Sequence, residues 1–355
     1  MRAFQFIALT LTAVAALTSG CNSLSTPRTL DIYFIDVEGG QATLIVTPAR
    51  QTLLVDAGYP ADGGARAVAG DPLKARDANR IVAAARDAGV TTIDYFLNTH
   101  FHADHVGGVP ELAQLMPIHA FIDHGGILPE AERVIPGTQA IFNAYAAVRA
   151  KGLHIEPKPG DRLPLRGIDA TVVSAAGTTL AKPLTGAGAS NSSCAAAPIR
   201  ALESAENPRS TGFVLDYGKF RFLDIGDLSG APLFNLACPR DMIGAVDAYL
   251  IAHHGGGDAA DPATFDAFKP RIAILNNGAI KGAQMETFTL LHRLPQIDVW
   301  QLHRANVAGD ANFADARIAN LDESTAHWLK LSARADGSFR IVNGRTGEST
   351  AYPAR

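Results

Sequence analysis

Residues 99–105 read THFHADH, and this is the most informative stretch of the chain about its fold. A strand-like run, IDYFL at 93–97, precedes it and Gly107-Gly108 follow it, so we expect a tight turn at the end of a strand. Its side chains of metal-ligand type are His100, His102, Asp104 and His105. Burying four such groups together is costly unless a partner satisfies them. A solvated, histidine-rich turn is the alternative.

Two divalent cations would satisfy this set of side chains. We expect His100 and His102 to face one ion. Asp104 and His105 are expected to face the other. Imidazole and carboxylate groups suit Zn²⁺, with Fe or Mn as substitutes. The sequence therefore predicts a two-metal centre, with Zn²⁺ as the expected ion.

The composition is that of a large globular protein. The chain has 355 residues, 47% hydrophobic and 19% charged, which is enough for one large α/β domain or two ordinary ones. This composition excludes a disordered chain. The net charge is −4 and no basic stripe is visible, so a surface built to hold a nucleic-acid backbone is not favoured.

The first residues are typical of a secretory leader. Arg2 is followed by an apolar run over residues 4–17, and small residues precede Cys21. We predict a signal peptide of the lipoprotein type over 1–21, with lipid on Cys21, and a tether over 22–29. Plain secretion is the alternative. In either case we expect an exported protein, periplasmic or at the cell surface, that touches the membrane only through a lipidated Cys21.

The other two cysteines, Cys194 and Cys238, lie 44 positions apart around a loop rich in Gly, Ala, Ser and Pro. Export to an oxidising compartment would allow them to form a disulfide. Two free buried thiols are the alternative. Neither cysteine lies in a CxxC pair, so a thiolate metal site is not expected.

The pattern of apolar residues predicts strands, then helices, and then strands and helices again. Strands are expected at 31–36, 42–46, 52–56, 93–97, 170–174, 212–217, 220–224, 246–252, 271–275 and 297–302, with three more in 326–352. Helices are expected at 76–88, 105–116 and near 130–151. Residues 175–205 read as a long loop that overhangs a site. The two halves predict one α/β domain over 30–355, a four-layer αββα sandwich of two mixed sheets with outer helices.

The stretch at 99–105 resembles the HxHxDH signature of metallo-β-lactamase-fold hydrolases, and other motifs agree in order. These are Asp56-Ala-Gly58, LDIGD at 223–227, DVEGGQA at 36–42, NPRS at 207–210 and AHHGG at 252–256. Together they are similar to the extracellular hydrolase domain of competence DNA-uptake proteins. The resemblance covers roughly residues 30–305. It implies a hydrolase with two metal ions.

The resemblance transfers metal ligands only where residues match. The matching positions are His100, His102, Asp104, His105 and Asp227, the last in the place of the bridging carboxylate. His253 and His254 follow a predicted strand, and one of them is expected to face the metals or the substrate. Alternation along the strand does not decide between them, so both are kept as ligands.

The chain departs from the family at the third histidine of the first metal site. The family places it about 60 residues beyond HxHxDH, and nothing stands there in this sequence. His124 and His303, each at the end of a predicted strand, are candidate replacements. Lys281 lies near the place of a further subgroup histidine.

These residues predict metal-assisted hydrolysis. Two ions bridged by Asp227 would hold a hydroxide that Asp104 orients. One of His253 or His254, or Lys281, would protonate the leaving group or hold a substrate anion. We expect a phosphodiester or a similar small anionic substrate, such as a nucleotide or short DNA fragment, and no protein partner. Two alternatives stay open: a lactone, ester or β-lactam hydrolase on the same metal core, and a non-catalytic metal-binding lipoprotein.

Overall fold

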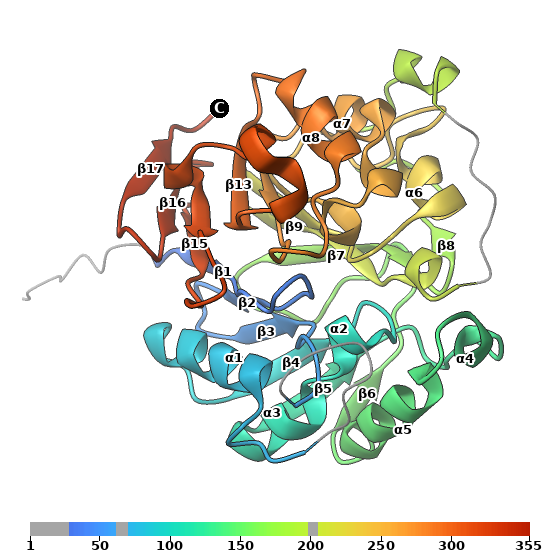
Figure 1. Cartoon of the computed structure of the whole chain (residues 1–355). Coiled ribbons are helices and arrows are strands. Elements are labelled where there is room, and N and C mark those ends of the chain that lie inside the picture. The colour runs from blue at the N-terminus through green and yellow to red at the C-terminus, as the bar shows by residue number, and fades with distance from the viewer. Residues whose placement is uncertain (1–27, 62–69, 198–204) are drawn as a thin grey trace, which may run out of the picture.

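A computed structural model describes residues 28–61, 70–197 and 205–355. The predicted signal peptide and Cys21 lie outside the described residues. None of the helices in the described part is both long and apolar enough to span a bilayer. Figure 1 shows two sheets lying between two groups of helices.

The first sheet has nine strands in the order β17-β16-β15-β1-β2-β3-β4-β5-β6. Their bounds are β1 (Leu30–Phe34), β2 (Thr43–Val46), β3 (Thr52–Val55), β4 (Ile93–Leu97), β5 (Ile118–Ile122), β6 (Leu153–Ile155), β15 (Leu329–Ala333), β16 (Phe339–Asn343) and β17 (Ser349–Tyr352). The last three are the strands expected in 326–352. They join the sheet through β15, which pairs antiparallel with β1.

The second sheet has eight strands in the order β14-β13-β12-β11-β10-β9-β7-β8. Their bounds are β7 (Asp169–Ala175), β8 (Thr178–Thr179), β9 (Gly212–Tyr217), β10 (Phe220–Asp224), β11 (Ala248–Leu250), β12 (Ile272–Leu275), β13 (Asp298–His303) and β14 (Ile318–Asn320). Both sheets mix parallel and antiparallel pairs, as predicted.

Helices cover the outer face of each sheet. Their bounds are α1 (Arg76–Asp87), α2 (Ala103–Val106), α3 (Val109–Leu115), α4 (Ala131–Val134), α5 (Thr138–Arg149), α6 (Gly230–Ala237), α7 (Pro262–Phe268) and α8 (Met285–His292). Apolar residues of α1, α3 and α5 pack on the first sheet, and those of α6, α7 and α8 pack on the second. A third apolar cluster lies between the sheets. The four-layer αββα sandwich is thus confirmed.

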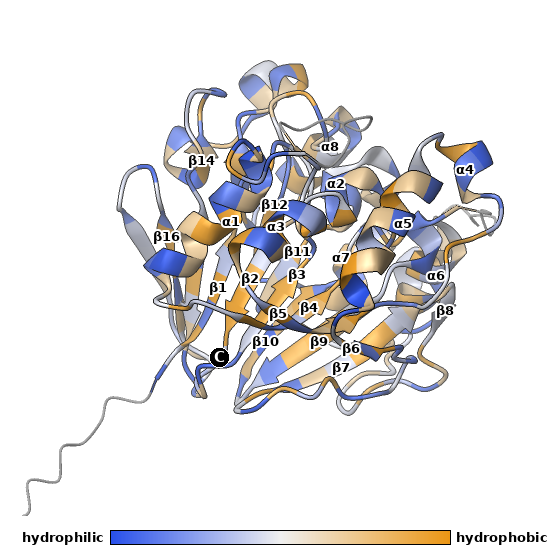
Figure 2. Cartoon of the chain, turned by 90° about the horizontal axis from the view of Figure 1, so that it is seen from below, coloured by the Kyte–Doolittle hydropathy of each residue, from blue (hydrophilic) through white to orange (hydrophobic). Residues whose placement is uncertain are grey.

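Alternation along β1 shows how the sequence builds these layers. Ile32 and Phe34 are fully or almost fully buried between the sheets, while Tyr33, between them, faces the helices. Successive side chains of a strand point to opposite faces, so a strand covered on both sides must be apolar throughout. Figure 2 shows such apolar strands in the middle of the molecule.

Parallel strands set the position of the functional groups. In the first sheet β3, β4 and β5 run parallel, and in the second β10, β11, β12 and β13 run parallel. The carboxyl ends of parallel strands meet at one edge of their sheet, where ligands usually bind. The HxHxDH turn follows β4, and the segments holding Asp227 and the His253-His254 pair follow β10 and β11.

The helix expected over 105–116 is divided in two. It begins earlier, at Ala103, so that Asp104 and His105 lie in the short α2, and it stops at Gly107-Gly108 before α3. A Cβ at Gly107 would lie 2.2 Å from the Ala103 carbonyl and 2.4 Å from Pro60 Cδ. The close approach of the Pro60 segment therefore requires glycine at the break.

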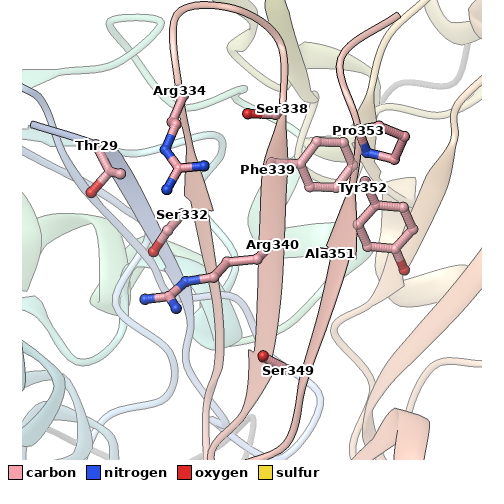
Figure 3. A pocket seen from close by; sticks show the side chains of 10 residues that line it. All are labelled: Thr29, Ser332, Arg334, Ser338, Phe339, Arg340, Ser349, Ala351, Tyr352 and Pro353. Atoms are coloured by element: carbon pink, nitrogen blue, oxygen red, sulfur yellow. The ribbon is translucent and has the colours of Figure 1, made fainter. Parts of the chain in front are cut away.

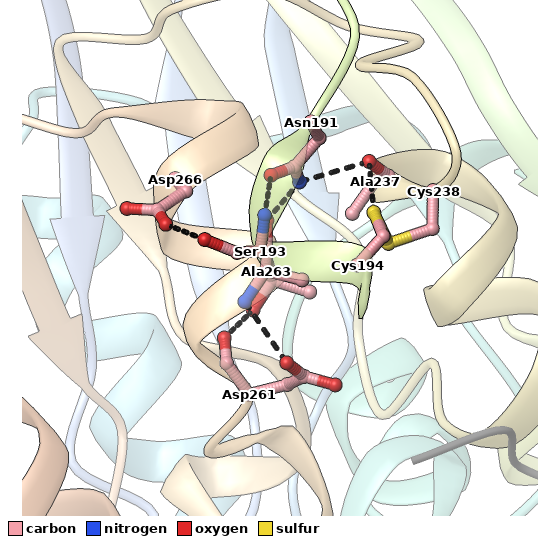
Figure 4. The surroundings of a disulfide bond; sticks show 9 residues. Asn191, Ser193, Cys194, Ala237, Cys238, Asp261, Ala263 and Asp266 are labelled. Atoms are coloured by element: carbon pink, nitrogen blue, oxygen red, sulfur yellow. Dashed lines mark hydrogen bonds between the residues drawn. A yellow bond between two sulfur atoms is a disulfide. The ribbon is translucent and has the colours of Figure 1, made fainter. Parts of the chain in front are cut away.

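The loop expected over 175–205 contains the short strand β8 and a 3₁₀ turn at Ser192–Ala195, and its residues 198–204 lie outside the described residues. Cys194 of that turn forms a disulfide with Cys238 at the end of α6, as expected (Figure 4). Asn191 reinforces this link through Nδ2 bonds to the Ala237 and Ala263 carbonyls. The described part of the loop is thus fastened to the helices of the second sheet.

Candidate metal centre

Two imidazole nitrogens converge at the first half of the centre. His100 Nε2 and His102 Nδ1 lie 2.9 Å apart, with the two rings edge to face. Thr99 Oγ1 lies 3.1 Å from His100 Nδ1 and holds that ring from behind. His100 is fully buried and His102 is partly exposed.

A second pair of imidazole nitrogens converges beside the first. His105 Nε2 and His254 Nε2 lie 3.2 Å apart, and both rings are almost fully buried. Asp104 Oδ2 lies 3.2 Å from each of these nitrogens. His254 arrives from the segment after β11, so this half of the centre joins the two sheets.

Asp227 lies between the two pairs. Its Oδ2 is 3.9 Å from His100 Nε2, 3.1 Å from His105 Nε2 and 3.2 Å from His254 Nε2. Its Oδ1 is buried without a hydrogen-bond partner among the described residues. A carboxylate so placed can reach both halves, as a bridging ligand must.

Buried polar residues support the ligands from behind. Asp56 Oδ2 accepts hydrogen bonds from His105 Nδ1 at 2.7 Å and from Thr99 Oγ1 at 2.7 Å. In the neutral tautomer that this contact selects, the lone pair of His105 is on Nε2, which faces the centre. In the turn that precedes Asp227, Asp224 Oδ1 accepts a hydrogen bond from Gly226 N at 3.1 Å. Gln41 Nε2 donates to both oxygens of Asp224, and burial raises the pKa of Asp224 to about 7.

The two carboxylates of the centre are held in the charged form. Burial by itself would raise the pKa of Asp104, but Lys281 and His105 lower it well below its usual range. The pKa of Asp227 is likewise held well below its usual range, against the effect of burial, by the neighbouring histidines. Both groups are therefore available as anionic ligands at neutral pH.

The residues fit divalent metal ions. Ligand atoms of Asp104, His105, Asp227 and His254 all lie within 4.8 Å of one another. Paired imidazole nitrogens that face each other, and two carboxylate oxygens against the same nitrogens, are costly to bury unless a cation lies between them. Nitrogen and oxygen donors of this kind suit Zn, Fe or Mn, and the donor set does not select one of the three.

The structure separates the roles of His253 and His254. Backbone φ is +50° at His253 and +54° at His254, so both residues are in the left-handed region, beyond the end of β11. His254 faces the cluster. His253 is about one-third exposed, with Nδ1 2.8 Å from Asp258 and Nε2 3.8 Å from Asp227 Oδ2.

Neither candidate for the missing third histidine reaches the cluster. His124 Nε2 bonds Glu206 Oε2 at 3.1 Å, and its ring packs against Phe101. His303 Nε2 lies 3.2 Å from both Asp36 and Glu38. Each histidine is thus bound to a carboxylate outside the centre.

A cavity of about 280 Å³ opens beside the centre. His102, Asp104, Asp227, His253 and Lys281 line its polar side. Lys281 Nζ bonds Asp104 Oδ2 and lies 5.4 Å from the centre of the Tyr59 ring.

The apolar wall of this cavity comes from residues 135–141, at the start of α5. Residues 175–197 do not line it, so the described part of that loop does not overhang the centre as expected. The sequence reasoning missed the 135–141 wall, Tyr59 and Asn207. For Asn207 a signal existed, because it opens the NPRS motif at 207–210.

Another cavity, of about 630 Å³, lies on the C-terminal strands, and Figure 3 shows its lining. Arg334, Arg340, Phe339 and Tyr352 lie among serine hydroxyls there. The lining contains no carboxylate and no imidazole. This cavity therefore contains none of the metal-ligand side chains described above.

Comparison with known proteins gives one family match. Residues 35–174 match the model of the metallo-beta-lactamase superfamily. This match and the four layers agree on the metallo-β-lactamase fold. No curated protein matches the chain.

Solved structures of this fold are similar to the chain at low identity. A Cronobacter sakazakii metallo-beta-lactamase with a HARLDQ motif has 14% identity over 56% of this chain, with a TM-score of 0.32, and 60% of its own length is covered. The metallo-beta-lactamase fold protein YhfI from Bacillus subtilis has 9% identity over 76% of this chain and 96% of its own, with a TM-score of 0.43. CmlA, a diiron β-hydroxylase from Streptomyces venezuelae, has 16% identity over 70% of this chain and 45% of its own length, with a TM-score of 0.36.

Proposed function

We propose that this protein is a dinuclear metal-dependent hydrolase. The proposal rests on two pairs of converging imidazole rings, His100 with His102 and His105 with His254. Asp227 lies between the two pairs. When bound, two divalent ions would lower the pKa of a water molecule and polarise the bond to be cleaved. Asp104, which is held in the charged form and lies at the centre, would orient that water.

We propose a small anionic substrate, with a phosphodiester as the first choice. Lys281 is the only lysine or arginine among the described residues that line the cavity, so one cationic side chain, paired with Asp104, lies where it would meet a bound anion. The cavity of about 280 Å³ holds a small group rather than a long polymer. The motif similarity to the hydrolase domain of competence DNA-uptake proteins supports this choice and suggests a nucleotide or a DNA fragment as the substrate.

The apolar wall around Ile135 and Ile141 also suits the carbon chain of a lactone or ester, which makes an acyl substrate the second candidate. We further propose that the protein is exported. The Cys194–Cys238 disulfide supports this, because disulfides persist mainly in oxidising compartments.

The experiment that tests the proposal is a metal titration followed by an activity panel. Metal-free protein is titrated with Zn²⁺ or Mn²⁺, and the loaded protein is assayed on bis-p-nitrophenyl phosphate, a lactone and nitrocefin. We expect two bound equivalents and turnover of the phosphodiester. Asp104→Ala should abolish turnover, while Asp169→Ala, an exposed carboxylate on β7, should leave it unchanged.

If the loaded protein cleaves only the lactone, the substrate is the second candidate, a lactone or ester, and not a phosphodiester. One equivalent or none, with no turnover of any of the three substrates, would refute the enzyme and favour a non-catalytic metal-binding protein.

A further inference from the structure

Asn207 lies beside the candidate metal centre, on the wall of its cavity. It lines the same cavity as His102, Asp227 and His253. Its Oδ1 is buried and has no hydrogen-bond partner among the described residues. A buried amide oxygen without a partner costs free energy, so its presence beside a metal-type cluster calls for a ligand.

The backbone holds Asn207 firmly in this place. It begins a 3₁₀ turn, Asn207–Arg209, which follows the buried residue Glu206. Glu206 accepts hydrogen bonds from Leu128 N at 3.0 Å and Phe101 N at 3.4 Å. Its Oε2 also lies 3.1 Å from His124 Nε2. The turn is therefore fastened to the segment that carries His100 and His102.

The end of the turn is attached to the same segment. Thr211 N donates to the Thr99 carbonyl at 2.8 Å, and Ser210 Oγ lies 3.5 Å from His100 Nδ1. Asn207 and His100 are thus positioned by one hydrogen-bonded unit. Such support from behind is what metal ligands require to keep their geometry.

Asn207 also contacts His253. Asp258 lies against Nδ1 of the His253 ring, and Asn207 Nδ2 lies 3.2 Å from Nε2 on the other side of that ring. With its Nδ2 against His253, the Asn207 amide has an Oδ1 without a hydrogen-bond partner among the described residues.

We propose that Asn207 Oδ1 is the third side-chain donor to the first metal ion, in place of a histidine, together with His100, His102 and Asp227. His253 is then a positioning residue that orients the Asn207 amide. The inference rests on the proposed function, since it needs the two-ion centre. An amide oxygen in place of an imidazole makes the site harder, which shifts its preference from Zn²⁺ toward Mn²⁺.

The test measures metal binding, not activity alone. Full-length protein freed of metal is titrated with Mn²⁺ and with Zn²⁺ by calorimetry, and metal content is measured after dialysis. We expect Asn207→Ala to bind one equivalent as the wild type does and the other at least 100-fold more weakly. Asn207→Asp, which keeps an oxygen donor, should bind both. Asn207→His should bind both and should prefer Zn²⁺ more strongly than the wild type.

Electron paramagnetic resonance of the Mn²⁺-loaded protein gives a second readout. The wild type should show a coupled two-manganese signal, and Asn207→Ala the six-line signal of a single ion. Asn143→Ala, on the exposed face of α5, is the matched control and should behave as the wild type. Circular dichroism establishes that each variant is folded.

The outcomes separate this inference from the proposed function. If Asn207→Ala binds both ions as the wild type does, Asn207 is not a ligand, although the two-metal hydrolase stands. If His253→Ala loses one ion and Asn207→Ala does not, His253 is the third ligand. If the wild type itself binds fewer than two ions, both the inference and the proposed function are refuted.

Discussion

His105 depends on a residue behind it as much as on the cluster in front. Asp56 is fully buried, and it binds His105 Nδ1 through Oδ2 and the Thr99 amide through Oδ1. We predict that Asp56→Asn keeps the fold but lowers the affinity for the second metal ion about 10- to 100-fold. The His105 ring loses the charged partner that fixes its orientation. Competition with a chelating indicator measures the affinity. Asp169→Asn serves as the control, and equal affinities in the two variants would contradict the prediction.

His303 gives the protein a pH-dependent stability. Burial alone would lower its pKa, but hydrogen bonds to Asp36 and Glu38 raise it to about 9. Because the pKa of His303 is higher in the folded state than in the unfolded state, its protonation stabilises the fold. This stabilisation is complete below the unfolded-state pKa of about 6.5 and is lost as the pH rises through about 9. It contributes roughly 3 kcal/mol to the free energy of unfolding. The free energy of unfolding of the wild type should therefore fall over this range.

The measurement is denaturant unfolding between pH 6.5 and 10. His303→Gln should lower stability at pH 6.5 and should show a weaker decline with pH than the wild type. His119→Gln, a change at an exposed histidine of β5, should keep the wild-type decline. Parallel curves for the wild type and His303→Gln would refute the role of this histidine.

Sequence reasoning could name the residues of the centre but not all of their roles. The HxHxDH turn is local, so its spacing alone brings four side chains together. The choice between His253 and His254 could not be made from strand alternation, because β11 ends at Leu250 and both residues are in the left-handed region. The role of Asn207 depends on a hydrogen bond to a residue 46 positions away, which spacing cannot reveal.

At the scale of elements, the strands were predictable where both of their faces are buried. The strand expected at 93–97 and the two expected at 212–217 and 220–224 have the observed bounds. The division of the helix after the HxHxDH turn into α2 and α3 was not predictable, because this break depends on the close approach of Pro60. Likewise, nothing local indicates that the 135–141 segment, and not the 175–197 loop, lines the cavity.

The turn between β1 and β2 supports α2 directly. Gly40 lies against Asp104, and a Cβ there would be 2.4 Å from the Asp104 carbonyl oxygen, which accepts a hydrogen bond from Gln41 N. We predict that Gly40→Ala lowers the free energy of unfolding by about 1–3 kcal/mol and weakens metal binding, because the backbone must move. Gly126→Ala, where a Cβ meets nothing within 4 Å, is the control. Denaturant titration in the presence of a chelator measures the stability of both variants. Equal stabilities of Gly40→Ala and Gly126→Ala would contradict the prediction.

For the whole molecule, the disulfide is the main covalent constraint. It joins residues 44 positions apart, so it restricts the unfolded chain and is expected to contribute about 3–4 kcal/mol. We predict that Cys194→Ala with Cys238→Ala lowers the urea midpoint accordingly and leaves the metal content unchanged, since neither cysteine lines the cavity. Reductant should lower the midpoint of the wild type and not of the variant. A wild-type midpoint that does not respond to reductant would contradict the prediction.

The pairing of β1 with β15 has a consequence for how the protein is made. Leu30 is synthesised long before its partner Ala333, which lies far along the chain. Until then β1 has a neighbour on one side only and offers a row of free backbone groups to any other nascent strand. The first sheet therefore stays incomplete until β15 has been synthesised, and the growing chain has an unpaired strand edge that can aggregate until then.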